Sequence, residues 1–182
     1  MGEFRAKVKG AFKEATSVVQ GRPGIFALLA GDHGEVASLL DQAIRTSSLE
    51  KRNALLERIR VELLSHSQAE DETFYATLEE HPETRHFVEE SRSDHQVVAS
   101  RLREALSDRG GPQQGLANLE RLRDAVEHHV AREENEIFAQ AQELIPDEES
   151  SHLAARFVQL KETKRNRLES NGAGWTREVA SK

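Results

Sequence analysis

Apolar side chains recur with helical spacing along most of the chain, and turn-forming residues separate the apolar stretches. The pattern predicts an amphipathic helix within residues 1–22. Five further helices are predicted, with the approximate ranges 24–46, 49–79, 83–107, 113–144 and 147–168. Residues 169–182 contain turn formers and few apolar side chains, so we expect a flexible tail there. No set of strands is predicted.

Long helices joined by short links fold most simply as an antiparallel bundle. We therefore predict an all-α protein: an antiparallel four-helix bundle with up-down-up-down topology, an additional N-terminal helix and a C-terminal helix. The bundle and its C-terminal helix would form one domain over residues 23–168. A sequence repeat with the length of one helical hairpin supports this arrangement, because it indicates two copies of a hairpin.

Composition narrows the classes of function. The net charge of −7 argues against a general nucleic-acid binder, which needs a basic face to neutralise phosphates. Cysteine is absent, which excludes disulfides, thiolate metal sites and cysteine nucleophiles. No apolar run approaches the roughly 20 residues that span a bilayer, and the N-terminal segment lacks the apolar core of a secretory signal. We therefore expect a cytoplasmic protein without a membrane span.

Two short phrases each occur twice in the chain. The sequence DHGEVAS begins at Asp32, and the similar DHQVVAS begins at Asp94. The other phrase, His-x-x-x-Glu followed directly by a second acid, begins at His66 and again at His129. Residues four apart share one face of a helix, so the histidine and glutamate of this phrase can address the same small volume. A repeat that served packing alone would need to conserve only the apolar residues between its two copies, whereas this one also repeats the histidines.

The apolar stripes of the predicted helices place four histidines and two glutamates toward the bundle core. These residues are His33, His66, Glu70, His95, His129 and Glu133. Burying such groups without partners costs several kcal/mol for each charge, and a bound cation would remove that cost. Imidazole and carboxylate ligands suit iron, zinc or manganese better than calcium or magnesium, and this set suits two metal ions. A single histidine on an apolar face is usually a packed core residue, but four in a two-fold repeat are much harder to explain by packing.

The order of these residues over four helices, H…HxxxE…H…HxxxE, resembles that of the hemerythrin-like, or HHE cation-binding, family. The resemblance covers about residues 24–145. It implies a centre of two iron ions with an oxo or hydroxo bridge. His33 and His66 of the first hairpin would hold one iron, and His95 and His129 of the second hairpin would hold the other. The glutamate of each His-x-x-x-Glu phrase would bridge the two irons.

Two positions depart from the pattern of the oxygen-carrying hemerythrins. Those proteins have a further histidine one turn after the ligand that corresponds to His95, where this chain has Ala99. They also have an aspartate five residues after the last histidine, where this chain has Glu134. The resemblance therefore implies an open coordination position, which disfavours reversible oxygen transport and favours redox reactivity or sensing. Glu134, Asp71 and Tyr75 are candidates for the missing ligand.

We predict a non-haem di-iron protein that binds or reacts with a small oxidant, namely dioxygen, peroxide or nitric oxide. Decomposition of peroxide is one activity consistent with this prediction, which makes the chain a candidate enzyme. The alternative is an iron- or oxygen-responsive sensor without turnover, which would signal to a protein partner through its terminal helices. An oxygen store or carrier is disfavoured by Ala99, and a metal-free scaffold is disfavoured by the repeat.

Other polar residues leave alternatives open. Asp32 and Asp94 are either solvated or orient an imidazole through a hydrogen bond. His128 is interpreted as a surface residue or as a neighbour of the metal ligands, because it points away from the face of His129. His81, which precedes Pro82 at a predicted helix end, is interpreted as a solvated cap, and His86 and His152 are interpreted as ordinary surface or interface residues.

Overall fold

The computed structural model describes residues 24–108 and 111–180. Its elements, in chain order, are α2 (Ile25–Arg45), α3 (Leu49–Asp71), α4 (Phe74–Glu79), α5 (Arg85–Leu106), α6 (Pro112–Arg132), the π-helical turn η1 (Glu133–Ile137), α7 (Phe138–Leu144) and α8 (Asp147–Ala180). The predicted all-α class is confirmed, since these ranges contain helices and no strand. None of the helices in these ranges combines the length and apolar character needed to cross a membrane. The helix expected within residues 1–22 lies outside the described part of the chain.

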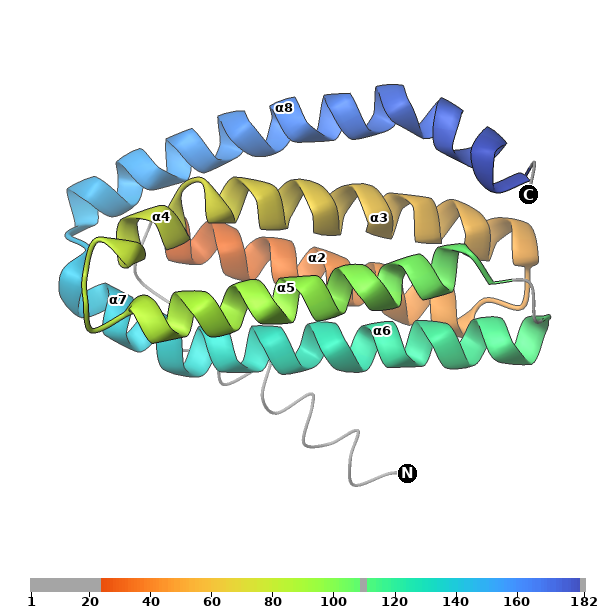
Figure 1. Ribbon diagram of the computed structural model, residues 1–182, viewed down its shortest axis with the longest axis horizontal. Helices are drawn as coiled ribbons and strands as arrows, with labels where there is room; N and C mark the ends of the chain where they lie inside the picture. The colour runs from red at the N-terminus through yellow and green to blue at the C-terminus, as the bar shows by residue number, and fades with distance from the viewer. Residues whose placement is uncertain (1–23, 109–110, 181–182) are drawn as a thin grey trace.

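Helices α2, α3, α5 and α6 form an antiparallel bundle. They lie lengthwise side by side, and the colour gradient shows that the chain reverses direction from each helix to the next (Figure 1). Within the bundle, α2 packs against α3 and α6, and α5 packs against α3 and α6. The long helix α8 lies along the outside of α3 and also contacts α2 (Figure 1). Four helices therefore surround one interior, and α8 covers it from one side.

The helix expected over residues 49–79 is two helices. Thr73, between α3 and α4, has φ −126° and ψ −84°, outside the helical region. Its hydroxyl donates a hydrogen bond of 2.7 Å to the carbonyl of Ala69, which satisfies an acceptor at the end of α3. The apolar spacing continues across this break, which is why the sequence pattern did not predict it.

The helix expected over residues 113–144 contains the π-helical turn η1. In this turn the N–H of Phe138 donates to the carbonyl of Glu133, five residues earlier. Single π-helical turns of this kind are frequently found at functional sites. Here the turn lies between α6 and α7, and it begins at one of the residues singled out in the sequence.

The C-terminal boundary also differs from the prediction. We expected the last helix to end near residue 168 and a flexible tail to follow, but α8 remains helical to Ala180. The glycines that suggested a turn, Gly172 and Gly174, each lower helix propensity by about 1 kcal/mol without blocking a helix as proline does. The boundary expected near residue 168 is therefore wrong.

Two apolar clusters fill the interior toward opposite ends of the bundle. One contains three aromatic rings with centroids 5.3–5.8 Å apart, namely Phe26, Phe74 and Phe138. The other consists of aliphatic side chains alone. Along α2, His33 lies between Leu29 of the first cluster and Val36 of the second. The fold therefore places a polar layer between two apolar ones.

Candidate metal centre

The polar layer contains the six residues that the sequence pattern selected. They come from every bundle helix and from the π-helical turn: His33 of α2, His66 and Glu70 of α3, His95 of α5, His129 of α6 and Glu133 of η1. The side chains of both glutamates are fully buried, and no side chain of the four histidines is more than 9% exposed. The structure therefore brings all six residues into one buried cluster.

The histidines of the cluster form two pairs. The ring centroids of His33 and His66 lie 5.0 Å apart, and those of His95 and His129 lie 4.6 Å apart. Within the second pair, the two Nε2 atoms are separated by 3.2 Å. These are the same pairs that the resemblance assigned to two separate irons.

Each glutamate lies between one histidine of each pair. Oε2 of Glu70 is 3.5 Å from Nε2 of His66 and 3.2 Å from Nε2 of His95. Oε2 of Glu133 has corresponding distances of 3.3 and 3.6 Å to Nε2 of the other two histidines. A carboxylate in such a position can contact two ions at once, one beside each histidine pair.

Several polar atoms of the cluster are buried and have no hydrogen-bond partner among the described residues. Five of them are Nε2 of His33, Nε2 of His66, both carboxylate oxygens of Glu70 and Oε2 of Glu133. A buried polar atom without a partner costs about 1–3 kcal/mol. Because these atoms lie around one small volume, a cation there would satisfy them together. Imidazole nitrogen with carboxylate oxygen is a donor set that suits iron, zinc or manganese.

A family model described as the hemerythrin HHE cation binding domain matches residues 24–141. The chain belongs to this family. The matched range contains the four bundle helices and every residue of the cluster, so the resemblance inferred from the sequence is confirmed. Membership of the HHE family and the buried histidine–glutamate groups together indicate a metal-binding domain. No curated protein matches the chain by sequence.

A solved structure has the same fold as this HHE domain. It is the crystal structure of a hemerythrin HHE cation binding domain-containing protein from Mycobacterium kansasii, with a TM-score of 0.72 and 20% sequence identity. The match covers 82% of this chain and 91% of that chain. The likeness extends beyond the four bundle helices, since the covered share exceeds what those helices supply.

The repeated aspartates of the HHE domain face the outer nitrogens of two cluster histidines. Oδ2 of Asp32 lies 3.1 Å from Nδ1 of His66, and Oδ2 of Asp94 lies 3.9 Å from Nδ1 of His129. Each aspartate therefore faces the histidine of the next helix rather than its own neighbour in sequence. A carboxylate at this position fixes the tautomer and orientation of a metal-binding imidazole. For Asp32 the geometry therefore favours the second interpretation, orientation of an imidazole through a hydrogen bond, whereas Asp94 lies beyond hydrogen-bond distance of His129.

The three candidates for the missing ligand occupy different places. Oε1 of Glu134 lies 2.8 Å from Nδ1 of His33, so this glutamate is hydrogen-bonded to the outer nitrogen of a cluster histidine. Tyr75 is fully buried, and its hydroxyl donates a hydrogen bond of 2.9 Å to Oε1 of Glu133. Asp71 instead pairs with an arginine of α5 at 3.2 Å. Glu134 and Tyr75 thus hold cluster residues in place, a role that the doubled acid Glu133-Glu134 only hinted at in the sequence.

The protonation of the metal-free cluster follows from its buried charges. Burial acts to lower the pKa of His33, but the adjacent carboxylates of Glu133 and Glu134 outweigh it and raise this pKa to about 10. Burial acts in the same direction on His66, and the charge of Glu70 outweighs it and raises the pKa of His66 as well. Conversely, burial favours a high pKa for Glu70, but the neighbouring histidines hold it well below its usual value. The metal-free cluster therefore contains imidazolium–carboxylate pairs, and a metal has to displace protons to bind.

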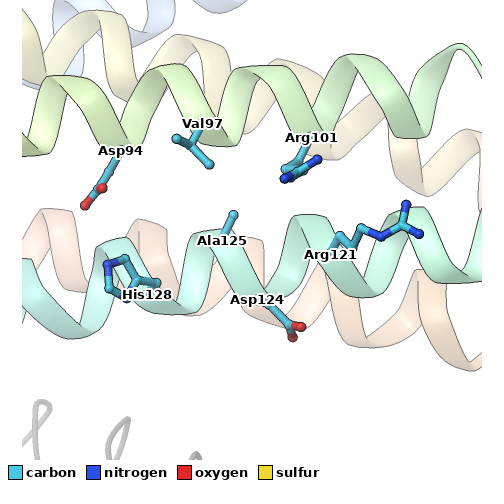
Figure 2. A pocket seen from close by; sticks show the side chains of 7 residues that line it. All are labelled: Asp94, Val97, Arg101, Arg121, Asp124, Ala125 and His128. Atoms are coloured by element: carbon cyan, nitrogen blue, oxygen red, sulfur yellow. The ribbon is translucent and has the colours of Figure 1, made fainter.

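Among the pockets on the described part of the HHE domain, two lie between bundle helices. The larger, of about 450 Å³, lies between α5 and α6 and is lined by the exposed side chain of His128 among others (Figure 2). The smaller, of about 280 Å³, lies between α3 and α5 and is lined by His95. Of these two pockets, the smaller is therefore the one that reaches the cluster.

The histidines outside the cluster and the pockets are at least partly exposed, in agreement with their interpretation as surface residues: His81, His86 and His152.

Proposed function

We propose that this HHE domain is a non-haem di-iron protein that binds or reacts with a small oxidant: dioxygen, peroxide or nitric oxide. The iron ligands would be His33, His66, Glu70, His95, His129 and Glu133. The position of the glutamates carries the proposal, because each lies between one histidine of each pair. Two bridging carboxylates with terminal ligands from facing helices are the arrangement of carboxylate-bridged di-iron bundles.

Bound iron would supply the redox chemistry and a coordination position for the oxidant, and the chain's own residues would hold the geometry. The Tyr75 hydroxyl donates its hydrogen to Oε1 of Glu133. Burial, with the charges of Glu133 and Glu70, raises the pKa of Tyr75 well above its usual value, so the phenol keeps its proton and remains a donor. The apolar clusters on both sides of the polar layer exclude bulk water from it.

Elemental analysis of protein purified without chelators tests the metal. We expect about two irons per chain, the number that a carboxylate-bridged bundle holds. Zinc in place of iron, or much less than one metal per chain, would move the function away from redox chemistry. Protein that takes up no metal even after reconstitution would refute the proposal.

The reaction with peroxide tests the activity. Reduced protein should consume hydrogen peroxide, and His95→Ala should lose both iron and turnover, because His95 is close to Glu70 and to the second histidine of its pair. His128→Ala is the matched control, since His128 is an exposed residue that directly precedes His129 on α6. Peroxide consumption that persists in His95→Ala would contradict the assignment of the site.

A second candidate function, an iron- or oxygen-responsive sensor without turnover, is favoured by one contact. Nζ of Lys161 in α8 lies 2.7 Å from Oδ2 of Asp32, the same oxygen that faces Nδ1 of His66. A change of metal or oxidation state at His66 would reach α8 by this path, where a protein partner could detect it. If the protein is a sensor, we expect the protease sensitivity of α8 or the oligomeric state to change on addition of metal or oxidant, without turnover. If it is an enzyme, we expect repeated turnover of the oxidant.

A further inference from the structure

The pocket between α3 and α5 connects the surface of the bundle with the cluster. Its volume is about 280 Å³. Ser67 and Gln68 of α3 line it from one side, Gln96 and Ala99 of α5 line it from the other, and His95 is among the lining residues. A water molecule occupies about 30 Å³ in the liquid, so a molecule as small as peroxide fits easily.

His95 differs from the other cluster histidines in its surroundings. The other three each have a carboxylate near the outer nitrogen Nδ1. Nδ1 of His95 is buried and has no hydrogen-bond partner among the residues that the structure describes, and the side chain as a whole is 9% exposed. Its Nε2 faces Glu70 and His129, at 3.2 Å from each. When a neutral imidazole binds metal through Nε2, its proton is on Nδ1. His95 is therefore the cluster histidine that lines the pocket and that has no carboxylate at Nδ1, and the Nδ1 atom itself is buried.

The lining of the pocket is electrically balanced. Its two charged residues, Asp71 and Arg92, pair with each other at 3.2 Å. The other polar lining residues, apart from His95, are one serine and two glutamines, and the remaining ones are aliphatic. Transfer of an unpaired charge into such surroundings is unfavourable, so the pocket suits a small uncharged molecule.

The groove between α5 and α6 provides the contrast. It is larger, about 450 Å³, but its lining includes none of the six cluster residues. Four of its lining residues are charged, and Figure 2 shows them around Val97 and Ala125: Asp94, Arg101, Arg121 and Asp124. Ala125 is a partly buried alanine in a bundle helix, as is Ala99, so the two grooves offer matched positions for substitution.

We propose that the α3–α5 pocket is the site where the small uncharged oxidant enters and docks beside His95, with Ala99 as the residue that sets its width. Hydrogen peroxide matches this lining best, because its oxygens can accept hydrogen bonds from the side-chain amides of Gln68 and Gln96 and its hydrogens can donate to the oxygens of the same amides. This inference rests on the proposed function and adds to it the approach of the ligand to the cluster.

Nitric oxide is a suitable probe, because it is small, uncharged and changes the absorption spectrum of ferrous iron. Ala99→Leu adds three carbon atoms to the pocket wall and should slow the association of nitric oxide with the ferrous protein about tenfold, since entry then requires a side chain to move. Ala125→Leu, in the other groove, should leave the rate within about twofold of the wild type. Stopped-flow absorption measures the rates, and iron per chain is measured in parallel for every variant. Ser67→Leu narrows the same pocket from α3 and decides the question if Ala99→Leu fails to retain iron.

The outcomes separate the pocket from the function. Slow association in Ala99→Leu or Ser67→Leu, with normal iron and a normal rate in Ala125→Leu, supports the pocket. Wild-type rates in both pocket variants, with iron retained, overturn the pocket and leave the proposed function intact. A wild-type protein that holds no iron, or whose iron does not react with nitric oxide, removes the basis of both.

Discussion

The two aspartate–histidine pairs beside the candidate metal centre are built from the same two repeated phrases, yet the surroundings of the pairs differ. In the first pair, Oδ2 of Asp32 lies 3.1 Å from Nδ1 of His66. The cation that balances this aspartate is Lys161, at 2.7 Å, and it belongs to α8, outside the four-helix bundle. The first pair is therefore complete only when α8 is packed against the bundle.

The second pair is complete within the bundle. Oδ2 of Asp94 lies 2.9 Å from Nη2 of Arg132, which is on α6 three residues after His129. The distance from this aspartate to Nδ1 of His129 is 3.9 Å, longer than in the first pair. The comparison shows that the repeat supplies an aspartate and a histidine to each half. The cation that balances each aspartate, and the distance from the aspartate to the histidine, depend on residues outside the repeat.

The largest effect on the half beside α8 should appear on acidification. In the metal-free cluster His33 and His66, which form the half beside α8, both have raised pKa values, and that of His33 is about 10. Below that pH, affinity for a metal in this half should fall roughly tenfold per pH unit for each proton displaced. We therefore expect this half to lose its iron as the pH falls. Iron content after desalting at a series of pH values measures the loss, and iron content that does not change with pH would contradict the assignment of these histidines as ligands.

The stability of the metal-free protein should depend on pH with the opposite sign. Because the pKa of His33 is raised by folding, its protonated form stabilises the fold; this contribution is complete below about pH 6.5 and is lost as the pH rises through about 10. Glu134→Gln removes the charge of one of the two carboxylates that raise this pKa, so the loss of Tm between these pH values should become smaller. Glu136→Gln, an exposed acid of the same π-helical turn, is the control. Identical pH profiles of Tm for the two variants would show that Glu134 does not act on His33.

Removal of each aspartate compares the pairs directly. Loss of the outer partner of a metal-binding histidine lowers metal affinity about 10–100-fold. Asp32→Ala should lie near the upper end of this range, because it removes the closer contact and also leaves Lys161 without one of its acids. Asp94→Ala should lie near the lower end. Anaerobic titration with ferrous iron measures both, with Asp41→Ala, an exposed acid of α2, as the control. Equal losses would mean that α8 adds nothing to the first pair.

The convergence of the six cluster residues could be predicted because it depends on local spacing. A histidine and a glutamate four residues apart share a helix face, and the apolar stripe of the same helix sets the direction of that face. The four bundle helices then have one interior in which these faces can meet. The fold class followed from the same pattern, with short links that force neighbouring helices to be antiparallel.

Features that depend on backbone irregularity or on α8 could not be predicted in this way. Consecutive residues of a regular α-helix point about 100° apart, yet Glu133 and Glu134 are both buried beside His33, and both lie in a π-helical turn that the apolar pattern does not mark. The importance of Lys161 was hidden for a different reason. It stands in a helix with charges on most of its length, where the local sequence does not distinguish it from Lys164.

Lys161 and Lys164 allow the smallest of these effects to be tested, namely the contribution of one α8 cation to the first aspartate–histidine pair. The Lys161 side chain is 11% exposed and lies 2.7 Å from Asp32 and 3.1 Å from Glu62. Lys164 pairs instead with Glu72, whose side chain is 48% exposed. Methionine preserves most of the apolar stem of a lysine and removes its charge.

Lys161→Met leaves a largely buried aspartate without its cation, so we expect the free energy of unfolding of the metal-free protein to fall by about 1–3 kcal/mol. Lys164→Met breaks an ion pair with a solvated acid, and its effect should stay below about 1 kcal/mol. Urea unfolding of the two variants measures the difference. If both lysines have the same small effect, α8 is held by its apolar face alone, and the first aspartate–histidine pair keeps its geometry without help from outside the bundle.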